Sequence, residues 1–231
     1  MPDSIIDVVI NFSKEHRLTH VPSSLSMLTY VNTIFETKRV VPYRDRIVIG
    51  KPFGSQAYYV VWKKLGFMDG VDISNLSVGV KHAEIDFVDY GEETMGNALG
   101  VGIGIAIANP HQRVWINITD ATLQMGSTLE ALQYIGHHKI KNIVVTVDYN
   151  NMQVTGTTQD IIDVDPVIQM CRSSENWSVQ QINGHDPDNI KLAWTDSSSM
   201  PRIFFYNTIK GYGVDYMERD PVLWHYKVIE Q

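Results

Sequence analysis

The sequence predicts an α/β protein with a doubly wound, mostly parallel sheet and helices on both faces of that sheet. Apolar runs of strand length alternate along the chain with segments of helical period. The runs are continuous in valine and isoleucine, as in "KNIVVTVDYN", and do not alternate with polar residues. Strands of this kind are buried on both faces, which is typical of parallel sheets covered by helices.

Each element follows from its own pattern. Strands are expected at residues 45–51, 113–120, 141–150, 177–182 and 201–208. Helices are expected at residues 54–67, 95–110, 126–139, 158–174 and 187–196. Gly66 and Pro110 are typical helix ends, and Pro166 is expected to break the fourth helix. Because no repeat, linker or clear boundary interrupts this alternation, we expect one domain over residues 1–231.

The composition narrows the class of protein. Of the 231 residues, 44% are hydrophobic and 19% are charged, which allows a sizeable core. The formal net charge of -7 speaks against a nucleic-acid or anionic-membrane partner. No apolar run approaches the roughly 20 residues that span a bilayer, and the acidic N-terminal segment is unlike a signal peptide. The one cysteine, Cys171, excludes a disulfide framework, fits the cytoplasm and is interpreted as a small buried residue.

Polar residues end two consecutive strands. Asp120 ends the strand 113–120, and Asp148 and Asn150 lie at the end of the next strand. In parallel sheets, ligands bind outside the carboxyl ends of the strands. Aspartate and asparagine at such positions also serve as turn and N-cap residues, so each position alone has a structural explanation. Together, two hard oxygen ligands at neighbouring strand ends suit Mg²⁺, which takes few protein ligands.

The stretch "TDATLQMGSTLEALQYIGHHKIKNIVVTVDYNNMQVTG" resembles a known signature. It is similar to the thiamine-diphosphate-binding N-terminal part of transketolases, especially of the split, two-subunit kind. The resemblance implies that Asp120, Asn150 and the backbone carbonyl of Met152 bind Mg²⁺, or another divalent cation such as Ca²⁺ or Mn²⁺. The cation would bridge these oxygens to the cofactor diphosphate. Ala121 stands where the family has the glycine that contacts the diphosphate.

Further segments extend the resemblance over nearly the whole chain. "RLTHVPSSLSMLTYVNTIF", "VKHAEID" and "NTIKGYGVDYMERDPVLWHYK" place His20, His82 and His225 at catalytic histidines of the family. Such histidines bind substrate hydroxyls and assist proton transfers, and His82 would also lie near the diphosphate.

The stretch "ETMGNALGVGIGIAIA" resembles the loop and helix start that face the cofactor rings. This resemblance implies cofactor contacts at Glu93, Met95 and Gly96, with a helix N-terminus close by. "INGHDPDNI" resembles a recurrent Gly-His-Asp turn, and we interpret its His185 as structural. Lys210 in "IKGYG" either neutralises an anionic group near the site or is a solvated lysine.

Some positions depart from the family. Thr119 and Ala121 replace the two glycines of Gly-Asp-Gly, and Met125 replaces an acidic residue. The extra methyl of Ala121 would weaken close approach to the diphosphate. Phe53, in "GKPFGS", stands where a histidine usually touches both cofactor and sugar. Because this histidine is missing, the usual ketose–aldose substrate pair is in doubt.

The resemblance implies an enzyme that transfers a two-carbon ketol unit from a ketose donor to an aldehyde acceptor. The glutamate that activates the cofactor belongs to a pyrimidine-binding domain, which this sequence does not match. We therefore expect that domain on a separately encoded subunit, in a heterotetramer that is active only when complete. Two alternatives remain open. One is an acyl or acetoin-type transferase that uses a 2-oxoacid, and the other is a non-catalytic scaffold or regulatory relative whose cofactor site has decayed.

Overall fold

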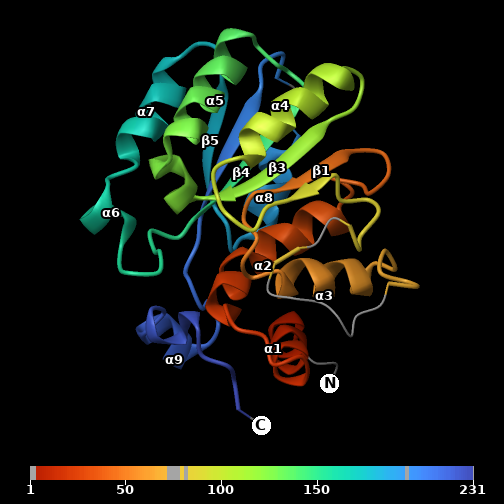
Figure 1. Cartoon of the computed structure of the whole chain (residues 1–231), viewed down its shortest axis with the longest axis vertical. Helices are drawn as coiled ribbons and strands as arrows, with labels where there is room; N and C mark the ends of the chain where they lie inside the picture. Colours follow the sequence, from red (N-terminus) through yellow and green to blue (C-terminus); the bar gives the residue numbers. More distant parts are fainter. Residues whose placement is uncertain (1–3, 72–78, 81–82, 196–197, 231) are drawn as a thin grey trace.

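A computed structural model describes residues 4–71, 79–80, 83–195 and 198–230. The described strands form one parallel sheet in the order β2-β1-β3-β4-β6-β5 (Figure 1). They are β1 (Arg46–Ile49), β2 (Tyr90–Gly91), β3 (Val114–Thr119), β4 (Ile143–Tyr149), β5 (Ser178–Asn183) and β6 (Arg202–Asn207). The predicted fold class and the five predicted strands are confirmed. β2 was not predicted, because a strand of two residues has no hydrophobic pattern.

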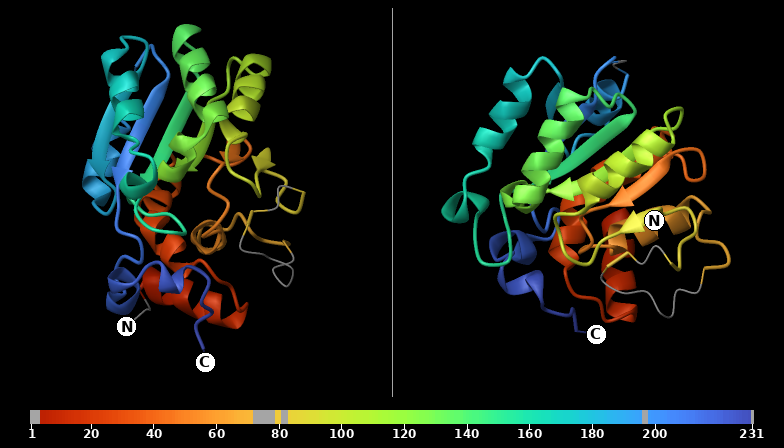
Figure 2. Two further views of the ribbon diagram at one scale, coloured as in Figure 1. Left: turned by 60° about the vertical axis from the view of Figure 1, so that its left-hand side comes forward. Right: turned by 45° about the horizontal axis from the view of Figure 1, so that its top comes forward.

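Helices cover both faces of this sheet, as Figures 1 and 2 show. One face packs against α2 (Val21–Glu36), α3 (Gln56–Lys64) and α8 (Pro187–Ala193). The other face packs against α4 (Ala98–Ala108), α5 (Gly126–His137) and α7 (Asp165–Ser173). Alternate strand residues point to the two cores: Trp115 lies in the first, and Ile116 in the second. The continuous apolar strands therefore have the two-sided burial that their sequence predicts.

Further helices and turns complete the described part of the chain. They are α1 (Ile5–Glu15), α6 (Thr158–Ile161), α9 (Asp215–Arg219) and two 3₁₀ turns, Asp120–Gln124 and Leu223–His225. α1 packs on α2 and α3 and extends the first core away from the sheet. The left view of Figure 2 shows α1 in red and α9 in dark blue at the same end of the molecule.

The predicted helix ends are largely confirmed. α3 ends at Lys64, and Gly66 takes the left-handed φ of +79° that favours glycine after a helix. The segment 158–174 is broken as predicted, but the break lies over residues 162–164, before Pro166. Pro166 sits in the first turn of α7, where a missing N–H costs no hydrogen bond.

A buried polar network ties α2 and α3 to the centre of the sheet. The side chain of Asn117 is fully buried in β3. Its amide oxygen accepts hydrogen bonds from Tyr30 of α2 (3.0 Å) and Thr146 of β4 (2.6 Å), and its amide nitrogen donates to Tyr58 of α3 (2.5 Å). Buried polar groups that are fully satisfied in this way fix a unique packing of helix on sheet.

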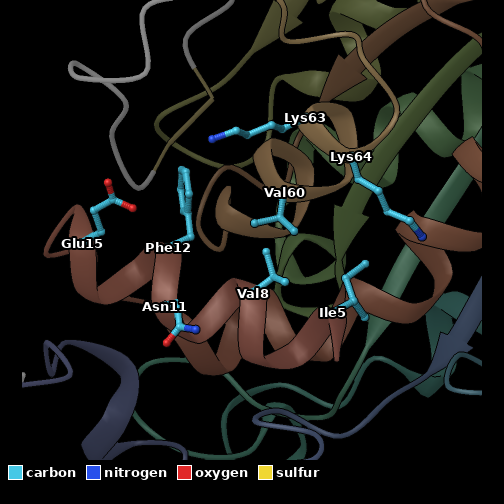
Figure 3. Close-up of a pocket in the computed structure, with 8 residues that line it drawn as sticks. All are labelled: Ile5, Val8, Asn11, Phe12, Glu15, Val60, Lys63 and Lys64. Carbon is cyan, nitrogen blue, oxygen red and sulfur yellow. The ribbon is translucent and has the colours of Figure 1, made fainter. Parts of the chain in front are cut away.

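A groove of about 610 Å³ lies between α1 and α3 (Figure 3). It is lined by apolar side chains such as Val8, Phe12 and Val60, with Lys63 and Lys64 at its edge. None of the described site candidates lies in it.

Among the described residues, every helix is too short or too polar to span a bilayer.

Candidate functional site

Asp120 lies at the carboxyl end of β3, where the chain turns into a 3₁₀ helix. Its side chain is completely buried. The carboxylate accepts hydrogen bonds from the Thr119 hydroxyl (2.9 Å), the Ala121 N–H (2.8 Å) and the Asn151 N–H (2.5 Å). Burial, helped by the negative charge of Asp148, raises the pKa of Asp120 to about 6. The β3 and β4 ends thus meet, as the sequence predicts.

Asn150 is oriented by its neighbours in the turn that follows β4. Its amide nitrogen donates to Asp148 (2.8 Å) and to the Ser26 hydroxyl of α2 (3.0 Å), and its amide oxygen accepts from the Met152 N–H (2.9 Å). Asn151 takes a left-handed φ of +58°, which turns the chain sharply. Asp120, Asn150 and Met152 are therefore brought to one edge of the sheet.

A buried ion pair lies beside Asp120 and Asn150 at this edge of the sheet, and it was not predicted from the sequence. Lys51 follows β1, and its ammonium group contacts the carboxylate of Asp148. Both side chains are almost fully buried. Ser26 and Thr208 also donate hydrogen bonds to Asp148 (2.8 and 2.6 Å). The signal was present, because Lys51 ends an expected strand at the same carboxyl edge as Asp120 and Asn150.

Lys210 follows β6 and lies beside the same edge. It is only 4% exposed, so the solvated alternative for this lysine is wrong. Burial, together with the charge of Lys51, lowers the pKa of Lys210 to about 8. No carboxylate of the described residues lies within ion-pair distance of its ammonium group. A desolvated cation without such a partner is suited to an anionic ligand.

Two of the predicted histidines, His20 and His225, lie against each other and line one cavity at this edge of the sheet. The backbone N–H of His20 donates to the backbone carbonyl of His225 (3.0 Å), and the two ring centroids lie 4.4 Å apart. Burial, helped by the charge of Lys210, lowers the pKa of His20 to about 4 and that of His225 to about 3. Both imidazoles are therefore neutral at pH 7, where they donate and accept hydrogen bonds. Nδ1 of His225 is buried and has no protein partner among the described residues.

Phe53 forms an apolar wall against this pair. Its ring stacks on His20 with centroids 4.6 Å apart and planes 17° from parallel. With Pro52 and Met95 it lines a cavity of about 200 Å³ that also contacts Ala121, Asn150, Met152, Lys210 and both histidines.

The loop before α4 is held by a glutamate that the sequence did not single out. Glu92 is buried, and its carboxylate accepts hydrogen bonds from the backbone N–H groups of Gly96 (3.1 Å) and Asn97 (2.9 Å). Met95 lines the cavity, whereas Glu93 is exposed and lies outside the lining. Two adjacent glutamates in a loop carry no period, so the sequence could not tell which one faces inward.

Two further histidines have different outcomes. His185 is structural, as expected: its Nε2 accepts a hydrogen bond from the Ile209 N–H (2.8 Å), and its ring stacks on Tyr212 at 3.6 Å. It thereby supports the turn that carries Lys210. His82 lies outside the described residues, so its expected role near the diphosphate stays a prediction.

The donor set fits a hard divalent cation and an anion. Among the described residues, no group of three His, Cys, Asp or Glu side chains could hold a metal. A cation here would instead take the Asp120 carboxylate, the Asn150 amide oxygen and a backbone carbonyl, and complete its shell with ligand oxygens, as Mg²⁺ does. A doubly wound parallel sheet with this set of donors at the carboxyl ends of its strands is typical of α/β proteins that bind an anionic cofactor there.

Comparison with known proteins narrows that class to a family. Residues 17–220 match the model of the transketolase thiamine diphosphate binding domain. The chain therefore belongs to this family.

Curated relatives agree with this assignment. The chain is 25% identical to a subunit of the apulose-4-phosphate transketolase of Phocaeicola vulgatus, over 90% of this chain and 81% of that protein. It is 26% identical to the 6-deoxy-6-sulfo-D-fructose transketolase subunit SqwG of a Clostridium species, over 92% of this chain and 84% of that protein. It is also 25% identical to rat transketolase, but spans only 31% of that chain.

Solved structures show the same fold. Transketolase from Leishmania mexicana superimposes with a TM-score of 0.77 at 18% identity, over 91% of this chain and 37% of that one. The Campylobacter jejuni transketolase gives a TM-score of 0.67 at 19% identity, over 92% of this chain and 38% of that one. The chain thus spans about a third of the length of these transketolases, but most of the length of the two curated subunits.

Proposed function

We propose that this chain is the thiamine-diphosphate-binding subunit of a two-subunit, transketolase-like enzyme. The observation that carries the proposal is that the Asp120 carboxylate accepts a hydrogen bond from the backbone of Asn151, next to Asn150, and that Asn150 and the buried Lys210 line the same cavity. The high coverage of two relatives that are themselves named as subunits supports the division into two chains.

The diphosphate would be held by opposite charge at this edge. Asp120, Asn150 and the carbonyl of Met152 would bind Mg²⁺ or a similar divalent cation, which neutralises the diphosphate in an acidic protein. Lys210, which has no ion-pair partner among the described residues, would contribute a second positive charge. Thiamine diphosphate, when bound, supplies the carbanion chemistry that cleaves and forms carbon–carbon bonds.

The neutral histidines would orient the substrate. His20 and His225 present hydrogen-bonding nitrogens in a partly apolar cavity, and Nδ1 of His225 lacks a partner among the described residues. A neutral imidazole can accept a hydrogen bond from one substrate hydroxyl and donate one to another oxygen, which fits the binding of a ketose donor from which a two-carbon ketol unit is transferred to an aldehyde.

A second subunit would complete the site. The cavity is flanked by exposed apolar side chains, among them Val154 and Tyr226, which are 40% and 62% exposed, with Ile209 and Leu223 nearby in the chain. Exposed apolar groups around such a cavity are typical of a surface that another protein covers. We propose that a pyrimidine-binding subunit covers it, in a heterotetramer with two interfacial sites.

A second candidate reaction keeps the cofactor and changes the donor. Phe53 places an apolar ring against His20 in the cavity, in a position where a hydroxyl-rich ketose finds no hydrogen bond. This favours acyl or acetoin-type transfer from a 2-oxoacid donor, which has fewer hydroxyls to satisfy.

A reducing cellular compartment is also proposed. Cys171 is buried, and burial raises the pKa of its thiol to about 12. The one cysteine of the chain is thus a free, buried thiol, and a chain without disulfides is consistent with the cytoplasm.

Calorimetry on the assembled complex tests the proposal. Thiamine diphosphate with Mg²⁺ should bind to the complex of wild-type chain and partner, and binding should be abolished by Asp120→Ala. Glu130→Ala, which removes an exposed acid from α5, is the matched control and should bind normally. Absence of binding to the wild-type complex would support a decayed site. Turnover of a ketose or 2-oxoacid by this chain alone would overturn the split-enzyme proposal.

A further inference from the structure

A basic hollow lies at the edge of the sheet opposite to the cofactor cavity. Two adjoining cavities of about 430 and 390 Å³ open at the amino ends of the strands and share His111, Gln112, Arg113 and Trp194. We call them together the amino-edge hollow. Arg113 precedes β3 and Asp120 follows it, so at the rise of a strand the two residues lie about 23 Å apart. The amino-edge hollow is therefore separate from the cofactor cavity.

Positive charge is concentrated in the amino-edge hollow. Its cationic lining side chains are Lys38, Arg39, Arg44, Arg113, Lys141 and Arg202. Among the described residues that line it, Asp45 is the sole carboxylate, and Arg44 already binds it at 2.8 Å. Such a concentration is unusual in a chain whose net charge is -7. It creates a local positive field that attracts anions.

Arg113 stands at the centre of the hollow, where both cavities meet. Its guanidinium donates to the carbonyl of Arg39 and lies 5.7 Å from the ring centroid of Trp194. No carboxylate of the described residues comes within ion-pair distance of it. Burial lowers the pKa of Arg113, and the charges of Arg44 and Arg39 lower it further, against the opposing effect of Asp45. The positive charge of Arg113 is therefore not neutralised by an acidic side chain among the described residues.

Neighbouring guanidinium groups lie beside Arg113. Nε of Arg39 is buried and has no hydrogen-bond partner among the described residues. The guanidinium of Arg202 is held in place over Trp194, 5.5 Å from its ring centroid. A guanidinium presents a planar fork of donors that matches two oxygens of a phosphate group. Packing thus positions the side chains at the centre of the hollow, and Arg39 keeps a donor still to satisfy.

We propose that the amino-edge hollow binds a small phosphorylated anion. Each cavity has the size of a small-molecule site, and the recessed Arg113 suits a compact anion better than a flat protein surface. Arg113 has a backbone carbonyl and an aromatic ring as its partners, whereas Arg46 forms an ion pair with Asp89 at 2.7 Å, so the positive charge of Arg113 is left for an anion. The proposal does not depend on the function of the cofactor cavity.

Titration with inorganic phosphate tests the site, by calorimetry on the full chain at constant ionic strength. The wild-type chain should bind phosphate, and Arg113→Gln should weaken binding about tenfold or more, since charge-assisted bidentate bonds are lost. The double variant Lys38→Gln/Arg39→Gln should weaken binding in the same way. This second variant changes residues outside the strands, so it tests the proposal even if Arg113→Gln fails to fold.

Two controls separate this site from other positive charges. Lys63→Gln/Lys64→Gln removes two lysines near the α1–α3 groove, and Lys210→Gln removes the buried cation of the cofactor cavity. The lysine pair should leave phosphate binding unchanged. Lys210→Gln removes only phosphate held in the cofactor cavity, so the binding that remains in this variant reports on the amino-edge hollow. The proposal is overturned if phosphate does not bind, if Lys210→Gln abolishes binding, or if the Lys38/Arg39 variant binds like wild type. Binding of an acidic peptide without binding of phosphate would also overturn it.

Discussion

Replacing Asp120 by asparagine should make the cofactor-free protein more stable at pH 7, although it removes a proposed cation ligand. The reason is that the wild-type protein holds a carboxylate in a completely buried position near a second one, Asp148. Without a cation, the charge of Asp120 is unfavourable, and asparagine has nearly the same shape without that charge.

The size of the effect follows from the pKa. Burial raises the pKa of Asp120 from 3.8 to about 6, a difference worth about 3 kcal/mol. Because the folded-state pKa is the higher one, this carboxyl stabilises the folded state fully below pH 3.8, and the stabilisation is lost as the pH rises through 6. Asparagine avoids the loss, but its NH₂ group cannot accept one of the three hydrogen bonds, which costs about 1–2 kcal/mol. The expected net gain at pH 7 is about 1–2 kcal/mol.

Urea unfolding of both proteins from pH 4 to pH 7, without cofactor or divalent cation, measures this gain. The difference between variant and wild type should be positive at pH 7 and should reverse near pH 4, where the wild-type carboxyl is neutral. Other acids cancel in the difference, and Glu130→Gln should give a flat difference curve.

A difference curve for Asp120→Asn that stays flat across this range would refute the reasoning, because burial would then not govern the ionisation of Asp120. Lower stability of the variant at pH 7 would refute it as well, since the lost hydrogen bond would outweigh the removed charge.

Three further predictions concern the neighbouring groups. Lys51→Met leaves the buried Asp148 unpaired and should lower the free energy of unfolding by about 3–5 kcal/mol in urea; Asp148→Asn in the same chain should restore part of it, and a loss below about 1 kcal/mol would contradict the role of the pair. Phe53→His should shift the kcat/KM ratio of the complex about tenfold towards ketose over 2-oxoacid donors, as one added hydrogen bond does, and an unchanged ratio would argue against a role in donor choice. Glu92→Gln weakens the two hydrogen bonds that hold the loop before α4, so the Kd of the cofactor should rise about tenfold in calorimetry with the partner, and an unchanged Kd would count against the positioning role.

The sheet and the meeting point of its strands could be predicted from the sequence. Continuous apolar runs separated by helical segments leave few arrangements other than a parallel sheet. Once the strands 113–120 and 141–150 are parallel neighbours, Asp120 and Asn150 must come to the same edge. The structure confirms that the two residues lie at the same edge, whereas their role as cation ligands remains a prediction.

Contacts that depend on tertiary packing could not be predicted. Lys51 and Asp148 both lie at strand ends of the same edge of the sheet, but they are 97 positions apart, and a strand-end position does not indicate which residues form an ion pair there. The burial of Lys210 depends on the helix and turn around it, so the sequence left two alternatives open. The amino-edge hollow is likewise assembled from separate segments, whose arginines look like ordinary surface residues in the sequence.

The order of the strands has a consequence for synthesis on the ribosome. β6 lies between β4 and β5, and among the described strands β5 pairs with β6 alone. A nascent chain therefore exposes an unpaired β5 until β6 has emerged, and unpaired strand edges favour aggregation. Lys210 and His225 follow β6, so the cavity is completed only in the last stage of folding. Binding of the cofactor would thus indicate that β6 has taken its place between β4 and β5.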